Sequence, residues 1–316
     1  MMKKTVLIFL AFCAAIPLTA QEEKPFGIKF SGFVKNDFFV DSRQTVAARE
    51  GHFLLWPSAE VLDVNGDDIN AGVNFNFLAI QSRLSGKITG PEAFGAKTSG
   101  LIEGDFFAQA NANINLFRMR HAFIKFKWEN TELLTGQYWN PLFVNDCFPG
   151  TVSFNTGTPL QSFARNPQIR LTQNLGNLKF IVAALSQRDY VSRGPAGASS
   201  DYLRNSAVPD MHLQIHFSAN NFVSGIGAAY KTIVPRLSST VITTPYSSYY
   251  DYDAVLDSVL LIETEEITEK YEVDEKVNGL TAIVFAKVKL EPLTIKLQGR
   301  YGENIADVLS ISGFAV

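Results

Sequence analysis

The chain has 316 residues, of which 46% are hydrophobic and 19% are charged, and its formal net charge is −3. That length is enough for a large core, and so small a net charge gives no reason to expect a nucleic-acid partner. After the first twenty positions no apolar stretch of about 18 residues occurs, which argues against a membrane protein built of helices.

The first twenty residues have the composition of a secretory signal peptide. Two lysines precede the apolar run 5–16, and the small residue Ala20 provides a cleavage point. A membrane-anchor helix is the alternative interpretation, but the run is short for one. We therefore predict a signal peptide over residues 1–20 and one exported domain over residues 21–316. Only Cys147 remains in that domain, so we expect no disulfide within the chain.

Extended segments that alternate apolar and polar residues follow one another along the domain. In the first of them Ile28 and Phe30 lie on one face, while Lys29 and Ser31 lie on the other. A soluble core strand rarely carries charge at alternate positions, because burying unpaired charge is costly. A strand with lipid on one face and water on the other can carry it. Eleven such strands are predicted, over residues 28–40, 79–89, 97–109, 116–128, 132–139, 168–173, 178–189, 210–217, 222–231, 277–290 and 293–301.

The first connection, over residues 41–71, contains a possible calcium loop. Asp63, Asn65 and Asp67 have the spacing of calcium ligands. Asp68, however, stands where such a loop needs glycine. We therefore interpret this segment as a turn and expect no metal there.

The longest connection ends near residue 276 and is strongly acidic. Residues 251–276 hold ten acidic residues and two lysines. We interpret the segment as a solvated loop, with divalent ions bridging it to lipopolysaccharide as the alternative. A short helix over residues 254–270 stays open.

Two details of the strands concern their faces and their ends. In the strand over residues 116–128 the alternation fails, because Lys125 and Lys127 fall on the apolar face; subunit packing is one explanation that the residues do not establish. Aromatic residues at strand ends are typical of the girdles of membrane barrels. The candidates are Trp128, Tyr138 and Trp139.

Connection lengths give the strongest indication of the fold. They alternate between long and short along the chain, with tight turns at residues 129–131 and 219–221. Outer-membrane barrels have short periplasmic turns and longer outer loops, whereas a soluble sandwich has no reason to sort its loops in this way. We predict an all-β fold, a transmembrane antiparallel β-barrel in the bacterial outer membrane. A secreted soluble β-protein is the alternative.

The predicted strand count conflicts with a closed barrel. Single-chain bacterial barrels have an even number of strands, and an open edge in lipid leaves backbone groups unsatisfied. The chain also ends at residues 313–316 without the usual terminal aromatic residue. We therefore expect the sequence to lack C-terminal strands.

Four short motifs lie within residues 79–143: Gln81-Ser82-Arg83-Leu84, Ile102-Glu103-Gly104-Asp105-Phe106, Arg118-Met119-Arg120-His121-Ala122 and Gly136-Gln137-Tyr138-Trp139. Together they resemble the DcaP-like family of trimeric outer-membrane porins. The resemblance implies a sixteen-stranded barrel, of which about five strands are absent here. It also implies a homotrimer and an arginine-lined constriction that passes small anionic solutes such as dicarboxylates. General porins fold their third outer loop into the lumen, and this likeness gives that role to residues 140–167.

The polar faces of the predicted strands supply the candidate pore-lining residues. Fixed cations in a narrow aqueous pore favour anions and oppose cations. Glu103 and Asp105 lie on the strand between those that carry the arginines, where they can pair with them. A structural charge network that lines an inert lumen is the alternative. The candidate constriction residues are Arg83, Glu103, Asp105, Arg118, Arg120, Gln137, Arg170, Lys296 and Arg300.

Two other functions are considered. A sugar-selective channel lines its lumen with aromatic side chains, and Phe33, Phe39 and Phe107 have inward parity. A barrel phospholipase needs a serine, a histidine and an asparagine or acid on its outer wall. His121 is the one candidate on an outward face, and no Ser–Asn pair accompanies it, so we do not expect an enzyme. No Rossmann, P-loop or paired-cysteine motif indicates a cofactor.

Overall fold

The structure is a computed structural model that describes residues 26–108, 110–151, 157 and 160–310. The predicted signal peptide, residues 1–20, lies outside the described residues, as do residues 313–316. No helix in the described part of the chain is long and apolar enough to cross a membrane. The helical elements are η1 (Asn111–Asn113), α2 (Asp201–Asn205) and η2 (Ala306–Val308).

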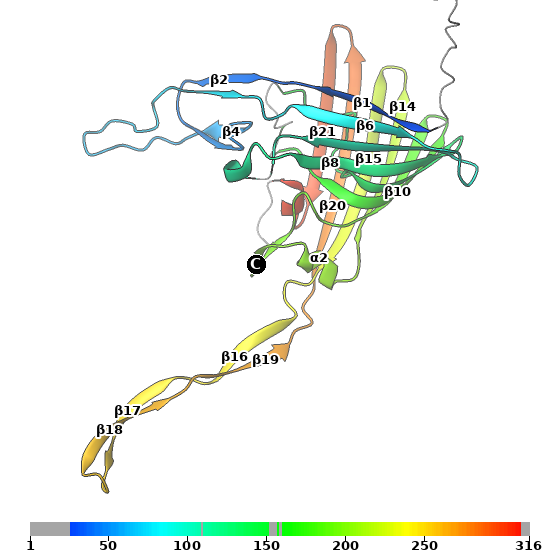
Figure 1. The fold of residues 1–316 in the computed structure, drawn as a ribbon. Helices are drawn as coiled ribbons and strands as arrows, with labels where there is room; N and C mark the ends of the chain where they lie inside the picture. Colours follow the sequence, from blue (N-terminus) through cyan, green and yellow to red (C-terminus); the bar gives the residue numbers. More distant parts are fainter. Residues whose placement is uncertain (1–25, 109, 152–156, 158–159, 311–316) are drawn as a thin grey trace, which may run out of the picture.

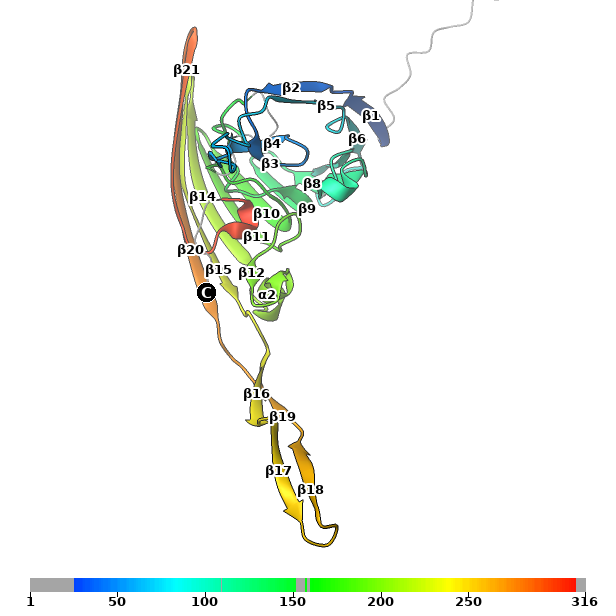
Figure 2. The same ribbon diagram turned by 90° about the vertical axis from the view of Figure 1, so that its left-hand side faces the viewer.

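Among the described residues, eleven antiparallel strands form one continuous, strongly curved sheet (Figure 1, Figure 2). Neighbours in the sheet follow one another along the chain, and β1 and β21 are its two edges. The predicted number of eleven main strands is therefore confirmed. The strands are β1 (Gly27–Phe33), β6 (Arg83–Thr89), β7 (Lys97–Asp105), β8 (Arg118–Lys127), β9 (Thr131–Trp139), β10 (Arg165–Leu175), β11 (Leu178–Leu185), β14 (Asp210–Ala219), β15 (Phe222–Ile233), β20 (Val277–Leu290) and β21 (Leu293–Gly302).

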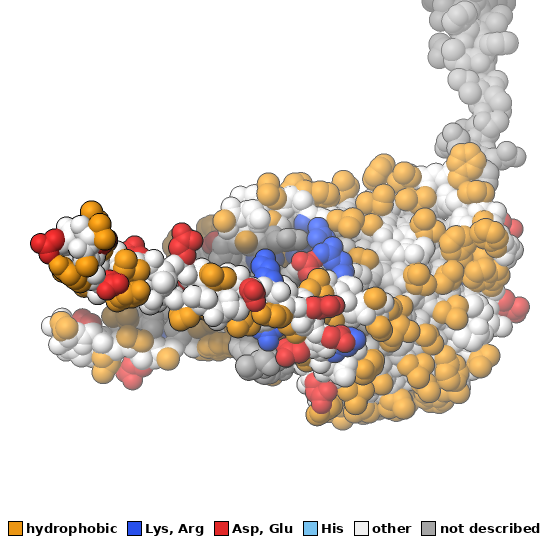
Figure 3. Space-filling model, turned by 90° about the horizontal axis from the view of Figure 1, so that it is seen from below, with side chains coloured by type: hydrophobic (Ala, Val, Ile, Leu, Met, Phe, Trp, Pro, Cys, Tyr) orange, Lys and Arg blue, Asp and Glu red, His pale blue; other side chains and the backbone are white. Residues whose placement is uncertain are grey.

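The two faces of the sheet differ in chemistry. On β14, Leu213 is 53% exposed, whereas its neighbours His212 and Gln214 lie on the concave side and are each 2% exposed. On β20 and β21 the outward residues Val284 and Leu297 are likewise exposed. Hydrophobic side chains cover much of the outer wall in Figure 3. An apolar outer face with a polar inner face is the arrangement of an outer-membrane β-barrel, and the predicted fold class is confirmed.

The first predicted strand and the connection after it differ from the prediction. Residues 28–40 divide into β1 and β2 (Asp37–Asp41). Between these two strands, the backbone N–H of Lys35 donates to Ser82 Oγ at 3.1 Å. β2 pairs with an unpredicted strand, β5. A small hairpin, β3 paired with β4, lies between them. The unpredicted strands are β3 (Thr45–Ala48), β4 (Phe53–Pro57) and β5 (Asn74–Leu78).

A β-bulge interrupts β8. Arg118 pairs with Asp105, but the register then shifts, so that Glu103 is opposite His121. The extra residue, Arg120, gives two successive residues the same orientation, which reverses the parity of the rest of the strand. The alternation read from the sequence therefore holds only up to Arg120.

The bulge changes the position of two lysines. Lys125 and Lys127 share the face of Glu103 by register, and Lys125 Nζ lies 2.9 Å from Glu132 Oε1. Ile124, by contrast, is 54% exposed on the outer face. The prediction that these lysines lie on the apolar face is wrong, and no subunit contact is needed to account for them.

The long connection between β15 and β20 is built of strands rather than helix. It forms two successive two-stranded ribbons, which project far from the barrel (Figure 1). The possible helix over residues 254–270 is therefore wrong. The strands are β16 (Ser238–Thr244), β17 (Ser247–Asp253), β18 (Ser258–Thr264) and β19 (Ile267–Glu272), and a further pair is β12 (Arg193–Gly194) with β13 (Gly197–Ala198).

The described part of the third predicted outer loop, residues 140–151, 157 and 160–164, packs against the inner side of the sheet. Its residues Leu142, Val144 and Cys147 form one buried apolar cluster with Ile283 and Phe285 of β20. Burial raises the pKa of the Cys147 thiol. The loop therefore occupies space inside the curve of the sheet.

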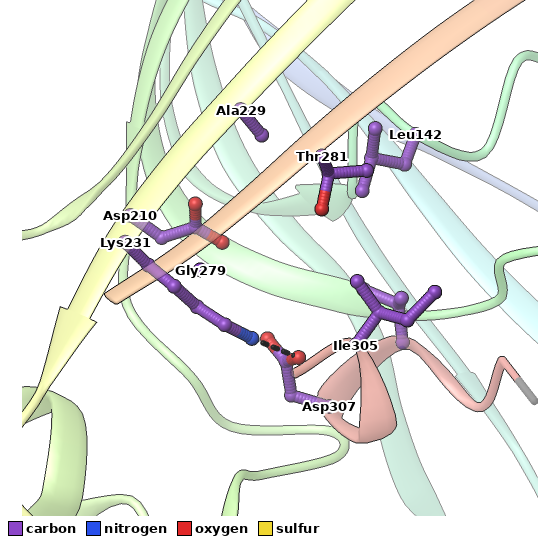
Figure 4. A pocket seen from close by; sticks show the side chains of 9 residues that line it. Leu142, Asp210, Ala229, Lys231, Gly279, Thr281, Ile305 and Asp307 are labelled. Atoms are coloured by element: carbon purple, nitrogen blue, oxygen red, sulfur yellow. Dashed lines mark hydrogen bonds and ion pairs between the residues drawn. The ribbon is translucent and has the colours of Figure 1, made fainter. Parts of the chain in front are cut away.

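The segment after β21 also returns to the inner side. Asp307 of η2 forms a buried ion pair with Lys231 of β15 (Figure 4). Gln187 Nε2 also donates to Asp307 Oδ2 at 3.0 Å. Ile305, on the same segment, packs near Leu142 of the inward loop. These contacts fix η2 and the loop to each other and to the wall.

Candidate functional site

Two carboxylates on β7 lie between arginines on the two neighbouring strands. The register places Asp105 opposite both Arg83 on β6 and Arg118 on β8. Asp105 accepts hydrogen bonds from Arg118 Nε and Arg120 Nη1, each at 2.8 Å. Glu103 accepts from Arg120 Nε at 2.8 Å and lies 3.5 Å from Arg83 Nη1. Neighbouring strands thus bring these five predicted residues together.

Two arginines that the sequence did not single out join this group. Arg165, at the start of β10, is fully buried, and its Nη2 lies 2.7 Å from Asp189 Oδ2. Arg49, in the β3–β4 hairpin, donates from Nη1 to the carbonyl of Phe107 at 2.6 Å. Alternation could not identify them, because both belong to segments predicted as connections. We call the following set the arginine cluster: Arg49, Arg83, Arg118, Arg120 and Arg165, with Glu103, Asp105 and Asp189.

Aromatic rings separate the guanidinium groups. Arg49 and Arg118 both lie over Phe107, with Cζ 5.3 Å and 4.7 Å from the ring centroid. Arg120 and Arg165 share Trp139 in the same way, at 5.7 Å and 5.3 Å. A cation is attracted to the face of an aromatic ring, so these two rings hold four like charges close together.

Of the three residues predicted to belong to an aromatic girdle, only Trp128 remains a candidate in the structure. Trp139 stacks on Phe143 of the inward loop at 4.3 Å, and Tyr138 lies against Arg170. The prediction that Tyr138 and Trp139 belong to an aromatic girdle is wrong, because both rings pack against residues on the inner side of the sheet. Trp128 donates from Nε1 to Phe94 O at 3.0 Å and stays a girdle candidate.

The predicted inward aromatic residues do not form a continuous row. Phe107 is 0% exposed inside the arginine cluster, and Phe39 packs edge-on against His52. Phe33 lies under Arg83, with the guanidinium carbon 5.2 Å from its ring centroid. These rings serve as platforms for cationic or imidazole side chains.

The β3–β4 hairpin and the inward loop cover most of the cluster. Arg118 is 8% exposed, Arg120 2% and Arg165 0%. Phe53 of the hairpin and Phe163 of the loop pack with Phe107 in one apolar group. The cluster is therefore a largely desolvated set of charges rather than a row of side chains in open water.

Burial also perturbs groups in the covering segments. Desolvation lowers the pKa of Arg49, and it raises the pKa of Tyr190 to about 12, with the neighbouring Asp189 acting in the same direction. His52 is 0% exposed, and burial lowers its pKa to about 4 although Asp37 lies 3.6 Å away. A neutral His52 is thus consistent with an apolar contact between hairpin and cluster.

Several hydrogen-bond donors of the cluster are not used within it. Arg118 Nη1 and Nη2 and Arg165 Nη1 are buried, with no hydrogen-bond partner among the described residues. Buried guanidinium donors without acceptors are costly, so an anionic group that reached them would be strongly favoured.

The other predicted constriction residues lie at different positions. Gln137 Nε2 donates to the carbonyl of Arg120 at 3.0 Å, and so supports the bulge. Arg170 binds Gln168 Oε1 at 2.8 Å beyond Trp139. Lys296 and Arg300 on β21 donate to the carbonyls of Phe148 and Leu160 at 2.8 Å and 3.1 Å. The two β21 residues therefore hold the inward loop and are separate from the arginine cluster.

The outward position predicted for His121 is wrong. His121 is 5% exposed and packs against Tyr138 and Trp139, with ring centroids 5.3 Å away in both cases. The bulge in β8 is the reason, because it turns His121 to the face of Glu103. The histidine considered for a phospholipase therefore does not lie on the lipid-facing wall.

The possible calcium loop is a hydrogen-bonded turn. Asp63 Oδ1 accepts from the backbone N–H groups of Asn65 and Asp67 at 2.8 Å and 2.9 Å. These bonds lower the pKa of Asp63. No group of three or more histidine, cysteine or acidic side chains suited to a metal occurs among the described residues.

Comparisons with known proteins bear on the fold. A scan against protein-family models and a search of curated proteins found no match. Of the solved structures, the outer membrane channel DcaP of Acinetobacter baumannii matches with a TM-score of 0.57 and 16% identity over 88% of this chain. OmpT of Vibrio cholerae matches with a TM-score of 0.47 and 9% identity, over 89% of this chain and 65% of its own. An anion-selective porin from Comamonas acidovorans matches with a TM-score of 0.42 and 14% identity, over 90% of this chain and 80% of its own.

The match to the DcaP channel has a limited extent along that protein. This chain spans 64% of its length. The chain resembles the DcaP outer-membrane channel in fold, as the four sequence motifs predicted.

Proposed function

We propose that the protein is an outer-membrane porin that forms a water-filled channel for small solutes and prefers anions. The arginine cluster is the observation that carries the proposal, since five guanidinium groups face three carboxylates on the inner side of the sheet. That leaves an excess of two positive charges (5 − 3 = 2).

The position of this excess charge supports anion preference. Charges in desolvated surroundings act over longer distances than charges in water, because the local dielectric constant is low. Fixed cations beside a narrow aqueous path lower the energy of an anion and raise that of a cation. Arg83 and Glu103 are the members nearest to water, with side chains 19% and 13% exposed. Arg83 is therefore the member that a passing anion meets first.

The proposal is tested by single-channel recording in planar bilayers, with the reversal potential measured under a salt gradient. We expect the unmodified protein to prefer chloride over the cation. Arg83→Gln removes one partly screened positive charge, so we expect this variant to show a smaller preference for chloride. Arg204→Gln, on α2 away from the cluster, is the matched control and is expected to leave the reversal potential unchanged. Cation preference in the unmodified protein would rule out the anion channel, and the absence of any channel would rule out the porin.

A sugar-selective channel is the second candidate function. Phe33 favours it, because this inward residue is 45% exposed and offers a ring face near the lumen. Liposome swelling separates the two functions. Faster entry of a neutral sugar than of a carboxylate of similar size would support the sugar channel over the anion channel.

Export and assembly are part of the same proposal. A signal peptide cleaved after Ala20 would deliver the chain to the outer membrane, where lipid and lipopolysaccharide surround it and homotrimers form. Cell fractionation with N-terminal sequencing tests the export, and unheated detergent gels test the trimer. A chain that stays in the cytoplasmic membrane with an intact N-terminus would contradict both.

A further inference from the structure

A separate cavity lies between the inner wall and the inward loop. Its volume is about 240 Å³, and it is bounded by inner residues of β9, β10, β11 and β14 and by residues 141–146 of the loop. Trp139 separates it from the arginine cluster, because its ring contacts Arg120 and Arg165 while its carbonyl accepts from Arg170 at 2.5 Å. The cavity is therefore next to the cluster but distinct from it.

The roof of this cavity is held in place from two sides. Gln214 on β14 donates from Nε2 to the carbonyl of Pro141 at 2.9 Å, and His216 Nε2 lies 2.9 Å from Gln214 Oε1. Phe143 stacks on Trp139 at 4.3 Å. The cavity is thus formed before any solute arrives, which lowers the entropy cost of binding.

Neither of the two cations in the wall forms an ion pair with a carboxylate among the described residues. Arg170 donates to two neutral acceptors, Gln168 Oε1 and the Trp139 carbonyl. Lys179 on β11 has no ion pair within 4.0 Å in the described part of the chain. Glu132 also lines the cavity, but it is already paired with Lys125 at 2.9 Å. One further acid, Asp146, lies in the roof, so the lining holds two cations and two acids. Because Glu132 is neutralised by Lys125, which lies outside the lining, one positive charge remains in excess.

The rest of the lining combines apolar and polar side chains. Tyr138 lies against the Arg170 guanidinium, with 5.1 Å between its ring centroid and Cζ. Phe143 and Leu134 line the same cavity. An anion with a flat apolar body therefore meets both a charge and an apolar surface here, whereas a fully hydrated anion uses only the charge.

We propose that this cavity binds a small aryl monocarboxylate. The carboxylate accepts hydrogen bonds from Arg170, which presents a planar guanidinium suited to that group. The ring lies against Tyr138 and Phe143. On β11, Lys179 lies four residues from the residue that is opposite Arg170. Its charge therefore attracts the carboxylate from the far end of the cavity. The inference rests on the proposed function, because the solute reaches the cavity through the channel.

The test is calorimetric titration of the full chain in detergent with benzoate, acetate and benzylammonium. We expect saturable binding of benzoate, about tenfold weaker binding of acetate because the apolar contact is lost, and none of benzylammonium. Arg170→Gln is expected to abolish benzoate binding, and Lys179→Gln to weaken it two- to threefold. Arg193→Gln, outside the cavity, is the matched control and is expected to bind like the unmodified protein.

A second variant covers the case in which Arg170→Gln fails to fold. Thr172→Glu adds an acid to the wall at a half-buried position and is expected to abolish benzoate binding with the barrel intact. Equal binding of acetate and benzoate, or unchanged binding in Thr172→Glu, would overturn the inference.

Channel recordings keep the two proposals apart. The arginine cluster is intact in Arg170→Gln and Thr172→Glu, so both are expected to retain chloride preference. A protein that prefers chloride but does not bind benzoate contradicts the cavity alone. A protein that binds benzoate but forms no anion channel contradicts the proposed function alone.

Discussion

Asp105 is the residue on which the arginine cluster depends. It is 0% exposed and forms hydrogen-bonded ion pairs with two arginines, while Arg83 approaches it at 4.0 Å. A buried charge that loses its partner is costly, because neither water nor another ion replaces it. Removing this one carboxylate leaves several buried cations facing each other.

We expect Asp105→Ala to destabilise the protein by about 3–5 kcal/mol. Glu103→Ala is the matched comparison, because Glu103 sits two residues away on the same face and is 13% exposed on its side chain. Its removal is expected to cost less, since water can reach the arginines there. Urea unfolding in lipid vesicles, followed by tryptophan fluorescence, measures both. Equal effects of the two variants would show that Asp105 has no special role in holding the cluster.

At the scale of the element, the bulge in β8 decides which residues face water. It places Arg118, His121 and Lys125 on one face. In a regular strand, Arg118 would lie on the face opposite to His121 and Lys125. Gln137 supports it by donating to the carbonyls of Met119 and Arg120. One inserted residue thus lets a single strand contribute to both the cluster and the Lys125–Glu132 ion pair.

The bulge is tested by single cysteines in a Cys147→Ser background. Lys125→Cys is expected to react rapidly with a charged, water-soluble thiol reagent, because its side chain faces the aqueous side. Ile124→Cys is the matched control, since it lies one residue away on the lipid face, where the thiol is not ionised and the reagent does not enter. Rapid labelling of Ile124→Cys with a protected Lys125→Cys would mean that β8 is regular and that the bulge is absent.

Alternation predicted the main strands well where their register is undisturbed. β20, predicted over residues 277–290, has those bounds, because one lipid face and one inner face enforce a strict period of two along it. The alternation within one strand, in contrast, does not determine how that strand pairs with its neighbours. The bulge at Arg120 and the short strand β5 therefore escaped prediction, and with them the inward position of His121.

The candidate site was predictable in part for the same reason. Arg83, Glu103 and Asp105 sit on regular strands, so their common face followed from parity. Arg49 and Arg165 reach the cluster through a folded-in hairpin and the end of a loop. Their position depends on tertiary packing, which no local period records.

At the scale of the whole molecule, the inner side of the sheet is partly apolar, which is unexpected for the water-filled lumen that we propose. Ile283 and Phe285 on β20 are 3% and 2% exposed, because the inward loop and η2 cover them. Polar contacts from Arg300 and Lys296 add to this attachment. The inward loop is therefore held by a buried apolar contact on one wall as well as by hydrogen bonds.

Weakening that contact is expected to change conduction without dissolving the barrel. Ile283→Ala combined with Phe285→Ala removes the apolar surface under Leu142 and Val144, where each truncation costs about 2–5 kcal/mol of packing. Because the loop then leaves the wall more often, we expect a larger and noisier single-channel conductance and faster proteolysis within residues 141–151. Val284→Ala is the matched control: it lies between the two positions but is 55% exposed on the lipid face, so the loop does not contact it. Unchanged conductance in the double variant would mean that the polar contacts of Arg300, Lys296 and Gln214 hold the loop without the apolar cluster.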